Sequence, residues 1–193
     1  MNVVETTKSI LFSPRSEWEK IGNVTESHVK VLTGYLIWLA LIPAIAALIG
    51  WGVIGYKVYT VHIGSLSLGI RYAVMQFISV IGGAYLTAGA FYFLAPNFGA
   101  EKNFDKAFQL AAYCYTAICV GGIFNLYWPL SFLAALSSLY SLYLLYIGIK
   151  PVMKTTDEKT NSYFIMALVC MIVVSAIVSG ILGKVFGLSL YNF

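Results

Sequence analysis

The stretch LAPNFGAEKNFDKAFQLAAY, residues 94–113, decides how this chain folds, because it is a short charged island between two long apolar runs. Six of its residues break helices or carry charge: Pro96, Gly99, Glu101, Lys102, Asp105 and Lys106. Pro96 and Gly99 are expected to end one helix, and Asn103 is expected to cap the next. We therefore predict a tight polar hairpin that joins two membrane-spanning helices.

The composition on either side of the island indicates an integral membrane protein. The chain has 193 residues, of which 60% are hydrophobic and only 10% charged, whereas soluble domains are about a quarter charged. The net charge of +4 is spread thinly, so nucleic acid is not an expected partner. Cys114, Cys119 and Cys170 all lie in apolar runs, which is typical of buried thiols and not of disulfides or metal ligands.

Five apolar runs are long enough to cross a hydrocarbon core of about 30 Å as helices. The fold class is therefore an all-α integral membrane protein, a five-span helical bundle that forms one transmembrane domain over residues 31–193. The spans are predicted at about residues 31–54, 69–95, 107–126, 130–149 and 162–186.

Residues 1–30 are predicted to form a separate cytoplasmic segment that contains a short amphipathic helix. Ser13 is expected to cap this helix, Pro14 to occupy its first position, and Trp18 to lie on its apolar face. Two interpretations are open. The helix lies on the membrane surface with Trp18 at headgroup depth, or it packs on the spans.

The distribution of charge predicts the orientation of the bundle. With a cytoplasmic N-terminus, nine of the 12 basic residues are cytoplasmic, and Lys57, Arg71 and Lys184 are on the other side. All eight carboxylates fall in the same cytoplasmic segments. The positive-inside rule therefore predicts a cytoplasmic N-terminus and an outward C-terminus, in an inner (cytoplasmic) membrane.

Few polar residues lie within the spans, and they form a candidate intramembrane cluster. The cluster either lines a pocket or pore, or its groups bond across helices and back to their own backbone. Arg71 is near the start of its span and is expected to extend to the interface, the alternative being that it turns inward and binds an anion or a carbonyl. The members are Arg71, Gln76, Asn125, Tyr140 and Tyr143.

Small residues recur four apart in the second and fifth spans, a spacing that lets helices approach closely. The candidates for close helix packing are Gly83 in the second span and Ser175, Ser179 and Gly183 in the fifth. Whether they join helices of one chain or of a homo-oligomer is open at this stage.

The sequence lacks the residues that common membrane enzymes need. No span contains a carboxylate, and no nucleophile elbow, zinc-binding HExxH or phosphate-binding loop is present. Glu101 and Asp105 are four residues apart, but beside Lys102 and Lys106 they are more typical of a solvated helix start than of a catalytic pair. We therefore predict no enzymatic activity, no catalytic or metal site and no cofactor.

The chain resembles the Yip-domain family of Ypt/Rab-interacting membrane proteins, in its prokaryotic form. The resemblance rests on Pro96 and Gly99 at the end of a span, on the run LYSLYLLYIGIKPVMK at residues 139–154, and on the opening with Ser13, Pro14 and Trp18. It implies five spans and a cytoplasmic N-terminus. Eukaryotic members look like binders of prenylated small GTPases, but this chain has only about thirty residues before the first span, and a long GTPase-binding region is not expected.

Taken with the charge pattern, these features predict a multi-pass, non-enzymatic protein that organises membranes or binds other proteins. Its partners would be the lipid bilayer and another membrane protein or a second copy of itself. The alternative is a small transporter, channel or lipid-moving protein that uses the intramembrane cluster. The candidate cytoplasmic interaction surface consists of Trp18, Pro96, Gly99, Glu101, Lys102, Asp105 and Lys106.

Overall fold

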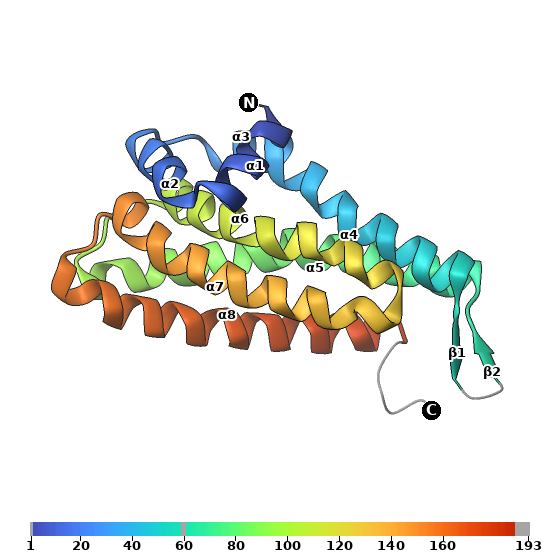
Figure 1. The fold of residues 1–193 in the computed structure, drawn as a ribbon. Helices are drawn as coiled ribbons and strands as arrows, with labels where there is room; N and C mark the ends of the chain where they lie inside the picture. The colour runs from blue at the N-terminus through green and yellow to red at the C-terminus, as the bar shows by residue number, and fades with distance from the viewer. Residues whose placement is uncertain (1, 59–60, 188–193) are drawn as a thin grey trace.

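Long helices make up most of the molecule, a computed structural model that describes residues 2–58 and 61–187 (Figure 1). Five helical segments are long and apolar enough to cross a membrane, and the predicted fold class is confirmed. Residues 188–193, at the end of the predicted transmembrane domain, lie outside the described residues. The five segments are His28–Ile54, Leu66–Phe98, Phe104–Leu126, Ser131–Met153 and Asp157–Val185.

The α-helices differ in length from one turn to eight. The bounds are α1 Val3–Phe12, α2 Pro14–Asn23, α3 His28–Val31, α4 Ile37–Ile49, α5 Leu66–Leu94, α6 Phe104–Gly121, α7 Ser131–Met153 and α8 Asp157–Val185. Wider π-helical turns at Leu32–Leu36 and Gly50–Ile54 extend α4 at its two ends.

Helix α6 is the central element of the bundle. Every residue from Lys106 to Ala117 is buried, and α4, α5 and α7 all pack against this helix. Small side chains such as Ala107, Ala111 and Cys114 allow neighbours to approach on several faces. A helix that is enclosed in this way belongs in the interior of a bundle, whereas α8 lies at its edge with most of its surface exposed.

Two helices precede the first span, where the sequence predicts only one. Asn2 caps the start of helix α1, where its side chain accepts a hydrogen bond from the backbone N–H of Glu5, and Ser13 follows the end of the helix. Ser13 is also the residue before α2, where its side chain does not form the capping hydrogen bond that was expected, and Pro14 occupies the first helical position as predicted. Ile10, Trp18 and Ile21 are buried, so the N-terminal segment packs on the spans as in the second of the two interpretations above.

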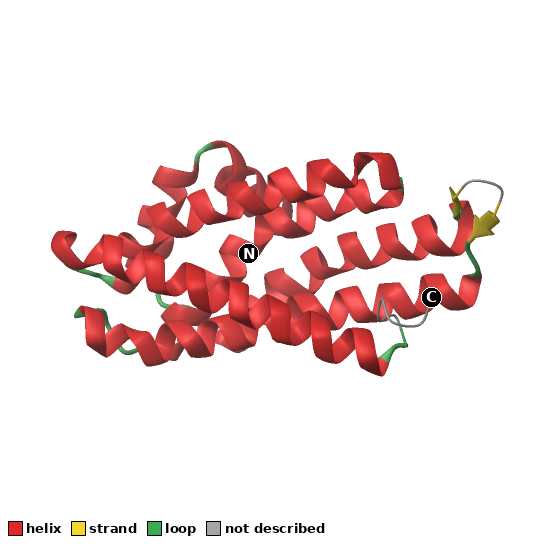
Figure 2. Ribbon diagram, turned by 90° about the horizontal axis from the view of Figure 1, so that it is seen from below, coloured by secondary structure: helices red, strands yellow, loops and turns green. Residues whose placement is uncertain are grey.

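A short antiparallel hairpin lies in the connection between the first and second spans (Figure 2). It pairs β1 (Tyr56–Val58) with β2 (Val61–Ile63). These strands are rich in β-branched residues, which favour extended backbone. Gly55, with φ of 64°, turns the chain out of the helix and into β1.

Candidate functional site

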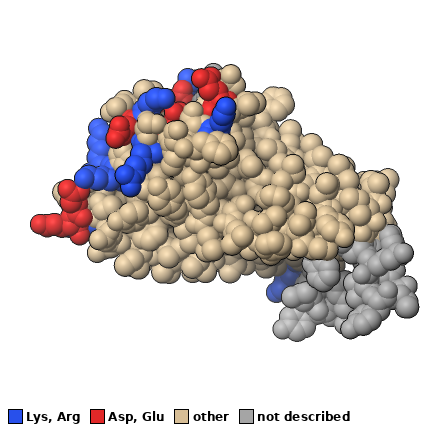
Figure 3. Space-filling view, in the orientation of Figure 1, with Lys and Arg blue, Asp and Glu red and all other residues tan. Residues whose placement is uncertain are grey.

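Charged side chains gather at one end of the bundle. Figure 3 shows most of them over the N-terminal helices and the adjoining end of the long helices, with a wide surface beyond that is uncharged except for a basic group at its lower edge. All eight carboxylates lie on α1, α2, the segment before α3, the island, or the first turns of α6 and α8. This end, which we call the charged end, is built from the island and the segments that pack around it.

The island forms the turn that the sequence predicts. Helix α5 ends at Leu94, a 3-10 turn covers Ala95–Phe98, and Gly99 adopts the left-handed conformation with φ of 66°. The Asn103 side chain then accepts hydrogen bonds from the backbone N–H groups of Asp105 at 3.0 Å and Lys106 at 3.3 Å. Pro96 and Gly99 therefore end one helix and Asn103 caps the next, as expected.

Ion pairs and one backbone bond fix the island to the end of α7. Lys106 is only 5% exposed, and its Nζ donates to Glu101 Oε2 at 2.6 Å. Lys154 Nζ is 3.7 Å from the same oxygen, and the Glu101 backbone N–H donates to the Met153 carbonyl at 2.9 Å. The hydrogen bond from Lys106, helped by the charges of both lysines, holds the pKa of the Glu101 carboxyl below its usual value.

Asp105 joins the start of α6 to the start of the first span. Its Oδ1 accepts the backbone N–H of His28 at 2.8 Å, and the ring Nδ1 of His28 lies 2.6 Å from the same atom. The His28 ring also lies edge-on to Phe104, with ring centroids 5.4 Å apart. Sequence reasoning missed His28, because nothing in the 77-residue separation from Asp105 indicates that the two residues meet.

Trp18 does not belong to an accessible surface, and that part of the prediction is wrong. Its side chain is fully buried, edge-on to Tyr113 of α6 with ring centroids 6.2 Å apart. Gly148 of α7 provides the space, since a Cβ there would lie 2.7 Å from the indole. The hydrophobic face that was expected to meet lipid or a partner is therefore used for packing α2 on α6 and α7.

The other predicted surface residues differ in accessibility. Pro96, Gly99 and Lys102 are exposed, and Glu101 and Asp105 are half-buried. The Lys102 ammonium lies 5.2 Å from the ring centroid of Tyr92, so its side chain is directed back along α5. Lys106 is buried, and its ammonium pairs with the carboxylate of Glu101. The accessible part of the predicted surface is thus the turn from Pro96 to Lys102.

The predicted intramembrane cluster is divided by α6. Arg71 and Gln76 lie on α5, Tyr140 and Tyr143 lie on α7, and α6 packs against both helices. Arg71 is exposed in the second turn of α5, consistent with the expected extension to the interface.

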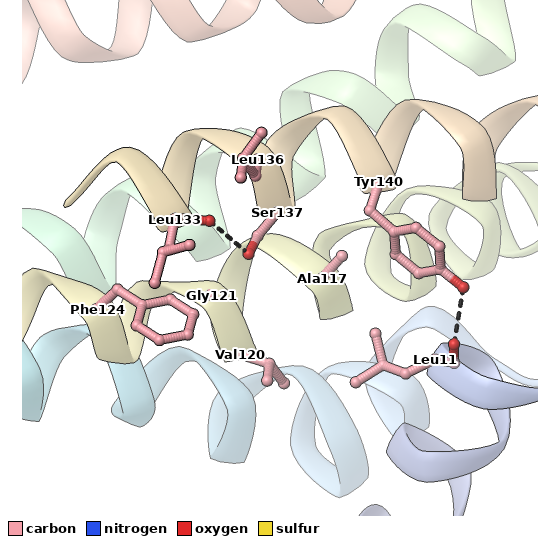
Figure 4. Close-up of a pocket in the computed structure, with 9 residues that line it drawn as sticks. All are labelled: Leu11, Ala117, Val120, Gly121, Phe124, Leu133, Leu136, Ser137 and Tyr140. Atoms are coloured by element: carbon pink, nitrogen blue, oxygen red, sulfur yellow. Dashed lines mark hydrogen bonds between the residues drawn. The ribbon is translucent and has the colours of Figure 1, made fainter. Parts of the chain in front are cut away.

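A hollow of about 330 Å³ lies beside Tyr140 (Figure 4). The side-chain hydroxyl groups that line it donate hydrogen bonds to backbone carbonyls. The Tyr140 hydroxyl donates to the Leu11 carbonyl at 2.7 Å, and Ser137 Oγ donates to the Leu133 carbonyl at 3.0 Å. The other residues that line this hollow are apolar, and Gln76, Asn125 and Tyr143 are not among them. The Tyr140 hydroxyl therefore joins α7 to α1, whereas the Ser137 hydroxyl is bonded to the backbone of its own helix.

The small residues predicted to pack helices also divide into two groups. Gly83 faces Tyr115 of α6, whose hydroxyl would lie 2.8 Å from an added Cβ. Ser175 and Ser179 are exposed on α8, and an added Cβ at Gly183 would meet nothing within 4 Å. Gly83 therefore packs helices within the chain, whereas the three small residues of α8 do not.

Comparison with known protein families identifies a match. The family model described as Yip1 domain matches residues 8–179, which is most of the chain. No curated protein and no solved structure matches the chain. Within the described residues, no group of three or more His, Cys, Asp or Glu side chains is arranged to hold a metal ion.

Proposed function

The chain belongs to the Yip1 domain family, and we propose that it is a non-enzymatic membrane protein that binds another protein through the charged end of its bundle. The observation that carries this proposal is the turn from Pro96 to Lys102, which is exposed yet held in place on both sides. A surface that is already ordered loses little conformational entropy when a partner binds, so it favours specific recognition.

Each anchor of this turn is a contact described above. The Met153 carbonyl holds the backbone of Glu101, and Asn103 closes the start of α6. Phe98 packs edge-on to Tyr163 of α8, with ring centroids 5.5 Å apart. The turn therefore presents Pro96, Gly99 and Lys102 from a fixed frame that joins α5, α6, α7 and α8.

The sidedness of the charged end is part of the proposal. Basic residues outnumber acidic ones in the chain, and nine of the 12 lie in segments at this end. The positive-inside rule supports a cytoplasmic N-terminus and an outward C-terminus in an inner (cytoplasmic) membrane. We also propose residues 1–30 as a cytoplasmic segment that docks on a transmembrane domain of residues 31–193.

A transporter, channel or lipid-moving protein is the competing function, and the arrangement of polar groups favours it less. Transport through the bundle needs polar groups that share one conduit. Here Gln76 lies on α5 and Tyr140 on α7, with α6 in contact with both helices, and the Tyr140 hydroxyl is bonded to backbone. Flux of ions, small solutes or labelled lipid through reconstituted liposomes would support transport over protein binding.

Site-specific photo-crosslinking tests the proposed partner surface. A photoreactive amino acid at Asn97 or Lys102, both exposed, is expected to capture a defined protein in intact membranes. The matched control is the same amino acid at Ser65 or Leu66, which are exposed at the opposite end of the bundle. Capture of the same protein with equal yield from both ends would contradict the proposal.

A charge change then tests whether capture depends on this surface. Lys102→Glu is expected to lower the yield of the captured complex from Asn97, because it reverses the exposed charge beside the crosslinker. Lys159→Glu, on the first turn of α8, is the control with the same change in net charge. An unchanged yield in Lys102→Glu with a loss in Lys159→Glu would place the contact elsewhere.

A further inference from the structure

A second feature of the charged end is a cleft of about 910 Å³ where α2, α7 and α8 meet. Its volume falls in the range of small-molecule sites. Helix α2 forms one wall, and the end of α7 with the start of α8 forms the other. Five charged side chains line it: Arg15, Glu19, Lys150, Lys154 and Asp157.

Both positive and negative side chains face this cleft, and two of them form no ion pair within the described residues. Lys150 pairs with Asp157 across the α7–α8 connection. Arg15 and Glu19 lie four residues apart on α2, and within the described residues neither forms an ion pair. A cation and a carboxylate that are one helical turn apart suit a ligand that carries an anion and an amine close together.

Lys154 also lines the cleft, at a position where the backbone is strained. Lys154 has φ of 53° and is the one non-glycine residue with positive φ in the described part of the chain. It ends α7 in the left-handed conformation, a position that glycine occupies with less strain. Its ammonium lies 3.7 Å from Glu101 Oε2 and has three donors, so it can hold Glu101 and still donate to a ligand in the cleft.

The cleft continues into apolar surface along both helices. On α7 the residues one and two turns before Lys150 on the same face are Tyr146 and Tyr143, both exposed. On α8 the residue one turn after Asn161 on the same face is Ile165, which is 61% exposed. The charged cleft thus lies where lipid headgroups would meet the bundle, with surface for acyl chains beside it.

We propose that this cleft binds the headgroup of a zwitterionic phospholipid that carries a primary amine. The phosphate contacts Arg15 and Lys154, the amine contacts Glu19, and the acyl chains follow α7 and α8. This inference goes beyond the proposed protein partner and does not depend on it. A soluble phosphate ester with an amine shares the same headgroup chemistry, so the experiment includes both sources.

Native mass spectrometry of the full chain in detergent measures the binding directly. Delipidated protein is mixed with phosphatidylethanolamine or phosphatidylglycerol at equal ratios, with and without soluble phosphoethanolamine. Phosphatidylethanolamine is expected to bind in preference, and the soluble compound is expected not to displace it. The double variant Arg15→Gln/Lys154→Gly should lower its occupancy about fivefold, as expected for the loss of charge-assisted contacts.

Three further variants make the result specific. Glu19→Gln should remove the preference for phosphatidylethanolamine over phosphatidylglycerol, because it removes the partner of the amine. Lys159→Gln, which lies outside the cleft, should leave binding unchanged. Lys154→Gly alone should lower occupancy, because it removes a cation that contacts the phosphate. Its thermal midpoint should stay close to that of the wild type, since the relief of the left-handed backbone offsets the loss of the exposed 3.7 Å pair with Glu101.

Several outcomes would overturn the inference. These are equal occupancy in the wild type and the double variant, phosphatidylglycerol bound as tightly as phosphatidylethanolamine, or the same loss in Lys159→Gln as in the double variant. Displacement of the lipid by soluble phosphoethanolamine would overturn the assignment to a membrane lipid. None of these results affects capture of a protein from Asn97, so the two proposals fail separately.

Discussion

Single residues hold the N-terminal segment on the bundle, and Trp18 is the largest of them. Its ring fills the space that Gly148 leaves between α2 and α7, and its indole N–H has no hydrogen-bond partner within the described residues. The contact is therefore apolar, and it depends on shape. A change of one methyl group at Gly148 is enough to test it.

Gly148→Ala is expected to destabilise the protein by about 1–3 kcal/mol, because the new Cβ would lie 2.7 Å from the Trp18 ring and 2.9 Å from Leu110 Cδ1. The free energy of unfolding in mixed micelles measures this cost. Gly82→Ala in α5 is the matched control, since an added Cβ there meets nothing within 4 Å, and it should stabilise the helix by about 0.4–1 kcal/mol. Equal effects of the two variants would contradict the packing described here.

Glu101 predicts a dependence of stability on pH. Lys106 lowers the pKa of its carboxyl below the ordinary value of 4.5, so the folded protein favours the charged form. The stabilisation is fully present above that ordinary value and is lost as the pH falls through the lowered pKa. In a pH series of thermal midpoints, the difference between wild type and Glu101→Gln should shrink towards low pH.

The control for this series is Glu158→Gln. Glu158 is exposed in the first turn of α8, and among the described residues it forms no ion pair. Its replacement should therefore lower the thermal midpoint less than Glu101→Gln does at neutral pH, since no ion pair is lost. A wild-type advantage over Glu101→Gln that grows as the pH falls would have the wrong sign for a lowered pKa.

At the scale of helices, α6 organises the structure, and the contacts at its start are the ones that tie it to the first span. Asp105 acts as a cap for α3 from another helix, since the Ser27 side chain forms no capping hydrogen bond and the His28 N–H is bonded to Asp105 Oδ1 instead. A carboxylate here satisfies a helix donor and is favoured by the dipoles of both helices.

Asp105→Ala is expected to cost about 1–3 kcal/mol, because it leaves the His28 N–H without its acceptor. Asp105→Asn keeps an oxygen at the same position and should cost less. Asp157→Ala removes an exposed carboxylate that pairs with Lys150 and should cost at most about 1 kcal/mol. Unfolding of the three variants in the same micelles gives the order, and a cost for Asp105→Asn equal to that of Asp105→Ala would exclude capping.

Sequence predicted those elements whose signals are local. Pro96, Gly99 and Asn103 act within one turn of the chain, so the island could be derived from them. The apolar runs predicted all five spans, but they did not predict the polar first turns of the helices. Helix α8 begins at Asp157 and not near residue 162, because acidic residues in a first turn stabilise a helix without being apolar.

The features that sequence missed depend on contacts between distant segments. Trp18 and Lys106 were expected on a surface. Trp18 is buried because Gly148, which is distant in the sequence, leaves space for its ring. Lys106 is buried because the fold of the island places Glu101 against its ammonium. The fifth-span residues Ser175 and Ser179 have the spacing of a packing face, but α8 lies at the edge of the bundle. Periodicity identifies a face and does not say which neighbour covers it.

For the molecule as a whole, the two ends differ in charge and this predicts how it sits in a membrane. The charged end contains all eight carboxylates, whereas the opposite end contains the hairpin of β1 and β2. Accessibility to a membrane-impermeant maleimide can decide which end faces the cytoplasm. Cys114 and Cys119 are fully buried, so Cys170→Ala alone removes the accessible native thiol from the background.

In this background, Lys102→Cys marks the charged end and Ser65→Cys marks the opposite end, and both positions are exposed. In right-side-out vesicles the reagent should label Ser65→Cys and leave Lys102→Cys unlabelled, because the basic residues hold the charged end in the cytoplasm. Inside-out vesicles should give the reverse, and detergent should expose both. Labelling of Lys102→Cys from the outside would show that the bundle has the opposite orientation. The proposed partner and headgroup sites would then lie on the outer face of the membrane.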